Sequence, residues 1–110
     1  MVAENRRGAV VGFALAHLLR QGRAHIVTLD VLPRYRGRGL GRELIEQCED
    51  QLRAGGARRV RLETAAANRA AQALYLSLGY TYVERLVGYY PDGQDAWLME
   101  KSLEQQGVRP

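Results

Sequence analysis

The chain is poor in cysteine, in lysine and in long apolar runs. Its 110 residues include a single cysteine, Cys48, and a single lysine, Lys101. One cysteine excludes an internal disulfide and fits a reducing compartment, so we expect a cytoplasmic protein. No apolar run is long enough to cross a bilayer or has the pattern of a secretory signal. The sequence also lacks a linker and an internal repeat, which favours a single domain.

The composition is that of an ordinary globular domain, with 46% hydrophobic and 25% charged residues. We predict one domain over residues 1–103 and a C-terminal tail over residues 104–110. The net charge of +4 suits an acidic ligand. It would suit RNA equally, but the basic residues are scattered and carry no recognised nucleic-acid motif, which argues against a nucleic-acid partner.

Hydrophobic spacing predicts both strands and helices. Strands are expected over residues 1–4, 9–19, 25–31, 60–64, 80–87 and 96–101. Helices are expected from Leu40 to the glycine pair Gly55-Gly56 and over residues 69–78. A strand–helix–strand unit makes part of the sheet parallel, and the hairpins make the rest antiparallel. The predicted class is therefore α/β (α+β), a mixed β-sheet with flanking helices.

The stretch from Pro33 to Arg42 is rich in glycine and arginine and connects a strand to a helix. A helix N-terminus with closely approaching backbone binds anions well, phosphates above all. A P-loop is excluded because Gly41 is followed by Arg42 and Glu43, and a dinucleotide fingerprint because its third glycine position is Arg42. The pattern that remains is Arg36-x-x-Gly39-x-Gly41.

This pattern resembles the pyrophosphate-binding motif of the GCN5-related N-acetyltransferases (GNAT superfamily). Other stretches are similar, in order and spacing, to the RimI family within it, the ribosomal-protein alanine and protein N-alpha-acetyltransferases. The matching stretches are Leu29–Pro33, Arg36–Arg42, Leu62-Glu63, Asn68-x-x-Ala71, Ala73–Tyr75, Leu78–Tyr80 and Tyr89–Ala96, followed by Met99.

The resemblance implies the GNAT acyl-CoA N-acyltransferase fold and acetyl transfer from acetyl-CoA to the N-terminal amine of a protein, without a metal. The Val31 N–H would polarise the thioester carbonyl, and Asp30 departs from the small or apolar residue usual in the family. Asn68 also reads as a plain helix cap. The implied cofactor-binding residues are Leu29, Asp30, Val31, Arg36, Gly37, Arg38, Gly39, Leu40, Gly41, Arg42 and Asn68.

The resemblance further implies two catalytic residues, Glu63 as general base and Tyr75 as general acid. An α-amine has a pKa of about 7.7–8.0 and must lose a proton before it attacks, while the leaving thiolate, with a pKa of about 8.5, takes one up. As a base, Glu63 could act directly or through a water molecule. The alternative role for Glu63 is that of a surface glutamate paired with Arg59 or Arg61. The alternative for Tyr75 is an aromatic side chain that packs on the sheet.

Four further residues have a possible functional role. Tyr89 and Tyr90 resemble the tyrosines that hold the substrate peptide, and cross-strand packing of exposed rings is the alternative. His17 and His25 are interpreted as ordinary hairpin histidines, because neither lies beside another chemical signal in the sequence. Cys48 falls on the apolar stripe of its helix and is interpreted as core packing.

Compared with the family it resembles, the chain lacks the usual N-terminal strand and two helices. An apolar sheet face and a strand edge are therefore expected to be exposed. A misassigned start, a fragment and a short form that covers this face as a homodimer all stay open. The alternative functions are acetylation of a small-molecule amine or of lysine, and a non-catalytic acetyl-CoA-binding module.

Overall fold

The computed structural model describes residues 1–4 and 7–104, which form a six-stranded sheet with two helices. The strands are β1 (Val2–Glu4), β2 (Val10–Leu18), β3 (Arg23–Val31), β4 (Arg59–Ala65), β5 (Thr81–Leu86) and β6 (Ala96–Ser102). They lie in the order β1-β2-β3-β4-β6-β5. Only β3 and β4 pair in parallel among these strands, and the other neighbours are antiparallel. The predicted fold class is confirmed.

Both predicted helices are present, and local sequence explains their ends. Helix α1 (Leu40–Ala54) starts after Gly39, which has a φ of 82°, a conformation that glycine adopts without strain. Helix α2 (Arg69–Ser77) is capped by Asn68, whose side chain accepts a hydrogen bond of 3.1 Å from the Ala71 N–H. The predicted strands also agree with the observed ones to within one or two residues at each end.

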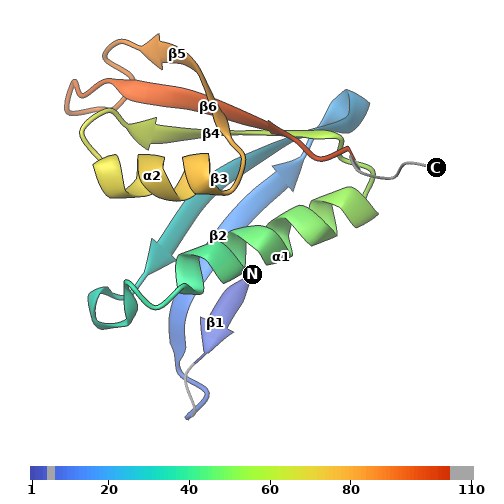
Figure 1. Cartoon of the computed structure of the whole chain (residues 1–110), viewed down its shortest axis with the longest axis vertical. Helices are drawn as coiled ribbons and strands as arrows, with labels where there is room; N and C mark the ends of the chain where they lie inside the picture. The colour runs from blue at the N-terminus through green and yellow to red at the C-terminus, as the bar shows by residue number, and fades with distance from the viewer. Residues whose placement is uncertain (5–6, 105–110) are drawn as a thin grey trace.

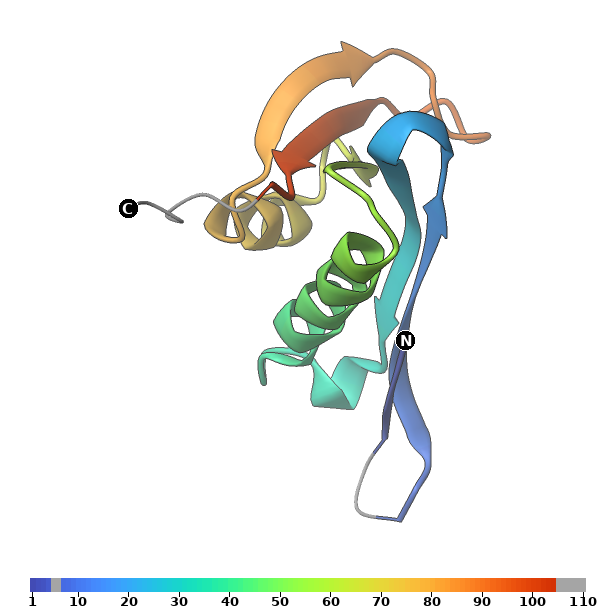
Figure 2. The ribbon, with the colours of Figure 1, turned by 90° about the vertical axis from the view of Figure 1, so that its right-hand side faces the viewer.

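The two helices cover the same side of the sheet (Figures 1 and 2). The apolar stripe of α1 is buried against the sheet. Cys48 belongs to this stripe and has an exposed fraction of 4%. The larger core cluster joins residues of both helices to β3, β4 and β6, so one apolar layer holds the glycine loop and the strands in place.

The side of the sheet away from the helices exposes apolar side chains. Val2 and Phe13 are cross-strand partners, Leu15 follows two residues later, and all three are exposed. Their neighbours Ala3 and Ala14 point to the other side and contribute to the cluster against α1. The expected exposed apolar face is therefore present on β1 and β2.

A buried ion pair joins α1 to the last strand. The Glu49 side chain, with a residue exposure of 2%, accepts a hydrogen bond from the Tyr80 hydroxyl at 2.8 Å and another from Lys101 Nζ at 2.9 Å. Burial, followed by the Glu49 charge, raises the pKa of Tyr80, so its hydroxyl stays protonated and donates to the carboxylate. Both donors compensate a charge that would otherwise be costly to bury.

Replacing the only lysine of the chain tests this ion pair. Lys101→Met leaves the Glu49 carboxylate buried without its cation, and we expect the free energy of unfolding to fall by about 3 kcal/mol. Urea titration followed by circular dichroism measures the change. Adding Glu49→Leu to Lys101→Met should restore much of the stability, since the uncompensated charge is then gone. A loss below about 1 kcal/mol in the single variant would contradict the assignment.

Candidate active site

Strands β3 and β4 pair at their first residues and then separate. Their parallel register runs through Arg23–Arg59, Ala24–Val60 and His25–Arg61. Beyond these pairs a cavity of about 390 Å³ lies between the strands, with Glu63, Tyr75, Tyr90 and Asn68 among its lining residues. Backbone groups on the facing edges of the two strands are thus free of each other and available to a ligand.

A second cavity, of about 540 Å³, lies at the glycine loop and shares Leu29, Asn68 and Ala71 with the first. Gly37 and Gly39 line it with φ values of 77° and 82°, and a Cβ atom on either would meet no atom within 4 Å. The loop backbone is therefore open to a ligand, next to the first N–H groups of α1, which have no intrahelical partner.

The structure brings most of the predicted cofactor residues into this second cavity. Those that line it are Leu29, Asp30, Val31, Arg36, Gly37, Gly39, Gly41, Arg42 and Asn68. Arg38 and Leu40 do not line it. The Arg38 guanidinium lies over the Tyr35 ring at 5.2 Å, and Leu40 packs against the smaller core cluster.

The two arginines in the cavity wall already have partners. Arg36 donates from Nε to the Val31 carbonyl at 2.8 Å, and its terminal nitrogen lies 3.7 Å from Asp30 Oδ1. Arg42 donates to the Ser77 hydroxyl at 2.6 Å. Each guanidinium keeps further N–H donors beyond these contacts, so both arginines add positive charge to the cavity wall.

The Val31 N–H points away from β2, and Val31 lines the second cavity. Leu32 donates its N–H to the Val11 carbonyl of β2 at 2.8 Å, and successive residues of a strand direct their N–H groups to opposite edges. The Val31 carbonyl lies on the same outer edge, where Arg36 bonds it. The backbone donor expected at the thioester is thus directed to the unpaired edge of β3.

Glu63 contacts His25, the last residue of β3 that pairs with β4. The His25 Nε2 atom lies 2.7 Å from Glu63 Oε1, and the two side chains are 33% and 17% exposed. This contact fits the interpretation of His25 as an ordinary hairpin histidine with a hydrogen bond, but it places His25 beside a predicted catalytic residue. The alternative prediction, that Glu63 pairs with Arg59 or Arg61, was wrong, since both arginines face Glu100. The error arose because the partners are 38 residues apart and meet only through the strand register.

Tyr75 lines the same cavity as Glu63 from the α2 side. Its ring packs edge-on against Tyr80 at 5.5 Å between centroids, and the residue is only 6% exposed. This burial raises the pKa of Tyr75 to about 12, because a phenolate would be poorly solvated there. The hydroxyl is thus a stable hydrogen-bond donor at neutral pH.

The loop between β5 and β6 brings two more tyrosines toward Glu63. Tyr89 and Tyr90 stack edge to face at 5.0 Å, and Tyr90 lines the gap. Burial, followed by the Glu63 charge and a hydrogen bond to it, raises the pKa of Tyr89. Both tyrosines thus lie near Glu63, the carboxylate that we expect to receive the acceptor amine.

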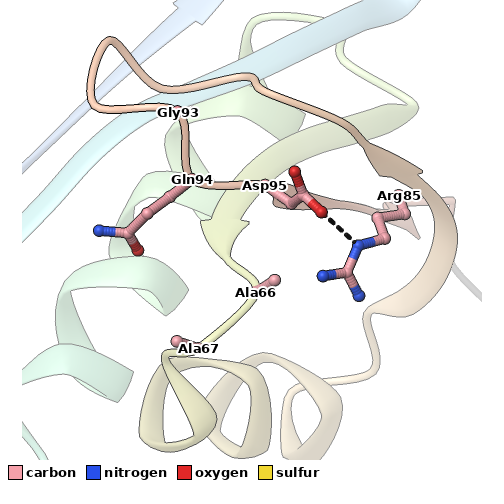
Figure 3. Close-up of a pocket in the computed structure, with 6 residues that line it drawn as sticks. All are labelled: Ala66, Ala67, Arg85, Gly93, Gln94 and Asp95. Carbon is pink, nitrogen blue, oxygen red and sulfur yellow. Dashed lines mark hydrogen bonds and ion pairs between the residues drawn. The ribbon is translucent and has the colours of Figure 1, made fainter.

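Asp95 braces this loop. Its carboxylate accepts hydrogen bonds from the Gly88 N–H at 2.8 Å and from Arg85 Nε at 2.7 Å. Figure 3 shows the second contact at the edge of a cavity of about 400 Å³. The Gly88 bond, followed by the Arg85 bond, lowers the pKa of Asp95. The carboxylate therefore stays charged and ties both ends of the tyrosine loop together.

Sequence reasoning missed two further residues of the site. Gln72 donates from Nε2 to the carbonyls of Ala65 and Ala66 at 3.1 and 2.9 Å, which fixes the end of β4 to α2. Thr64 lines the gap, and its buried hydroxyl has no partner among residues 1–4 and 7–104. The available sequence signal for Gln72 was its place in the first turns of the helix that Asn68 caps. Nothing in the sequence indicated Thr64.

Two other properties concern the same described part of the chain. Neither of its helices is long and apolar enough to cross a membrane. Within residues 1–4 and 7–104, no cluster of histidine, cysteine and carboxylate side chains has the make-up of a metal site.

Comparison with known proteins assigns the family. The acetyltransferase (GNAT) family matches residues 1–80. An N-alpha-acetyltransferase of Saccharolobus solfataricus is 38% identical over 90 residues, which are 81% of this chain and 53% of that protein. The [ribosomal protein bS18]-alanine N-acetyltransferase of Escherichia coli is 37% identical over 97 residues, 86% of this chain and 65% of that protein. The chain thus spans between about half and two thirds of the length of these relatives.

Solved structures agree with this assignment. The ribosomal-protein-S18-alanine N-acetyltransferase from Escherichia coli superimposes with a TM-score of 0.82 at 34% identity, over 96% of this chain and 70% of that one. A chain of the NatC complex bound to Gag peptide and CoA gives a TM-score of 0.81 at 28% identity, over 86% of this chain and 62% of that one. The chain belongs to the acetyltransferase (GNAT) family.

Proposed function

We propose that this protein is an N-acetyltransferase that moves the acetyl group of acetyl-CoA to the N-terminal amine of a polypeptide, in the cytoplasm. The observation that carries the proposal is the connected pair of cavities. One cavity contains the glycine loop. The other contains Glu63, which is hydrogen-bonded to His25 and lies beside the unpaired edge of β3. The relatives named for N-terminal acetylation support the choice of acceptor.

The glycine loop and the gap divide the binding of acetyl-CoA between them. The loop N–H groups and the start of α1 would hold the pyrophosphate, an anion suited to a helix N-terminus. The pantetheine arm would follow the shared wall of Leu29, Asn68 and Ala71 into the gap. The Val31 N–H, on the wall of the second cavity, would donate to the thioester carbonyl oxygen and stabilise the negative charge that develops on it.

Glu63 and His25 would prepare the acceptor. The Glu63 carboxylate takes a proton from the ammonium group, and the free amine then attacks the thioester carbon. A bond forms between nitrogen and carbon, and the bond between carbon and sulfur breaks. His25, bonded to the carboxylate and one-third exposed, orients Glu63 and gives the proton a route to solvent.

Tyr75 would act on the leaving sulfur. Its pKa of about 12 exceeds that of a thiol, about 8.5. Complete proton transfer to a free thiolate is therefore unfavourable, and a hydrogen bond from the hydroxyl to the developing thiolate is the stronger contribution. The sulfur then takes its proton from the nitrogen, which loses one as the amide forms.

Substitution at the Glu63–His25 pair tests the function. We expect Glu63→Gln to lower kcat for a peptide acceptor by about 10²- to 10⁴-fold, because the amide accepts no proton. His25→Gln should lower it by about tenfold, since glutamine can still bond Glu63. Mass spectrometry of the acetylated peptide measures both rates.

His17→Gln is the matched control for these variants. His17 lies directly opposite His25 in the β2–β3 register and is exposed, so its replacement should leave the rate unchanged. Acetylation by Glu63→Gln at the wild-type rate would refute Glu63 as the base. Absence of turnover in a folded wild type that binds acetyl-CoA would favour the non-catalytic binding module.

The raised pKa of Tyr75 predicts the pH profile. The rate for an α-amine acceptor should rise with pH to about 8, as the acceptor deprotonates. It should not fall again below pH 10, because Tyr75, with a pKa of about 12, keeps its proton there. Tyr75→Phe should lower kcat by about 10- to 100-fold without changing the ascending limb.

The descending limb decides whether Tyr75 acts as proposed. Initial rates between pH 6 and about 10.5 locate both limbs. A descent near pH 9 in the wild type that disappears in Tyr75→Phe would mean that the hydroxyl ionises at or below its ordinary value, against the effect of burial.

A further inference from the structure

A fourth cavity, of about 480 Å³, lies on the other side of the Glu63–His25 pair. Its lining residues are Leu19, Arg23, Ala24, His25, Arg59, Arg61, Glu63, Leu86 and Leu98. Glu63 is shared with the gap between β3 and β4. The carboxylate that we propose as the base therefore separates a cavity on the cofactor side from one that the cofactor path does not use.

The fourth cavity is rich in arginine. Arg59, Arg61 and Glu63 alternate along β4 and so share one face of the sheet, while Val60 and Leu62 between them are buried in the helix-covered core. Arg23 joins them from β3, as the direct partner of Arg59. Three guanidinium groups thus surround the approach to Glu63 from this side.

Nearby carboxylates do not neutralise these arginines. Glu100 is shared by two of them, at 2.6 Å from Arg61 Nε and 3.9 Å from Arg59 Nε. Arg23 bonds the Arg20 carbonyl at 3.3 Å and makes no ion pair within residues 1–4 and 7–104. With Glu63 and Glu100 both counted, the cavity keeps an excess of positive charge.

We propose that the fourth cavity binds an acidic side chain of the acceptor, so that the preferred acceptor is a polypeptide N-terminus with Asp or Glu at its second residue. The proposal rests on the proposed function. Arg61 precedes Glu63 by two residues on one strand face, a separation of about 7 Å. An extended peptide with its amine at Glu63 places its second side chain at a similar distance, beside Arg61.

Half of the Arg61 side chain is exposed, so it is accessible to such a carboxylate. A carboxylate and a guanidinium form charge-assisted hydrogen bonds with defined geometry. Because the pair would stay partly solvated, we expect a moderate preference and not an absolute requirement. A basic second residue would instead be repelled.

Matched peptides that differ only at their second residue, Glu, Gln or Lys, test this proposal. The wild type should acetylate the Glu peptide with a kcat/KM about fivefold above that of the Gln peptide, and the Lys peptide most slowly. Arg61→Gln should bring the Glu-to-Gln ratio close to one. Arg23→Gln, which breaks no ion pair in the described part of the chain, should lower the same ratio if Arg61→Gln folds poorly.

Arg58→Gln is the control. Arg58 adjoins Arg59 in the chain and is exposed, but it does not line the cavity, so its replacement should leave both the rate and the ratio unchanged. A wild-type ratio near one, or a ratio that neither Arg61→Gln nor Arg23→Gln changes, would overturn the proposal while the acetyltransferase function stands. Faster turnover of free glutamate than of the Glu peptide would overturn the peptide assignment.

Failure of the function itself is recognised separately. If no peptide is acetylated, the proposed function fails. Peptide binding then tests by itself whether the cavity recognises an acidic side chain. Titration of the ¹⁵N-labelled protein with the Glu peptide should then shift the backbone amide resonances of Arg23, His25 and Arg61, whereas the Gln peptide should not. Equal shifts with both peptides, or none, would overturn the proposal.

Discussion

The separation of β3 from β4 is the constraint on which the site depends. After three paired positions, each strand has an edge without its neighbour, and buried backbone groups need other partners. The protein supplies some of them: Arg36 bonds the Val31 carbonyl, and Gln72 bonds the carbonyls at the end of β4. The groups that remain, the Val31 N–H among them, are available to a ligand.

Both helices serve this gap as well as the core. Helix α1 begins at the glycine loop and presents its N-terminus to the larger cavity, and α2 contributes Tyr75 and is capped by Asn68 at the junction of the two cavities. Because both pack on the same side of the sheet (Figure 2), neither of these helices lies over the arginine-rich cavity that Glu63 lines on the other side. The cofactor and the acceptor can therefore approach the carboxylate from opposite directions.

Local patterns were enough to predict the elements and the loop. Helical spacing after Leu40, the cap at Asn68 and the glycine pattern around Gly39 act over a few residues, and each is confirmed in the structure. The contact of His25 with Glu63 depends on the register of two strands that are far apart in the chain, which no local pattern encodes. The partner of Arg42 was missed for the same reason, since Ser77 is 35 residues away in the chain.

The central claim, that the glycine loop holds the pyrophosphate of acetyl-CoA, is tested most directly by calorimetric titration with acetyl-CoA. Gly39→Glu places a negative side chain in the open loop, and Gly56→Glu does the same at the far end of α1, where φ is also positive and the space is also open. The account predicts wild-type binding that Gly39→Glu weakens by about 100-fold and that Gly56→Glu preserves. Equal binding by Gly39→Glu and Gly56→Glu would contradict it.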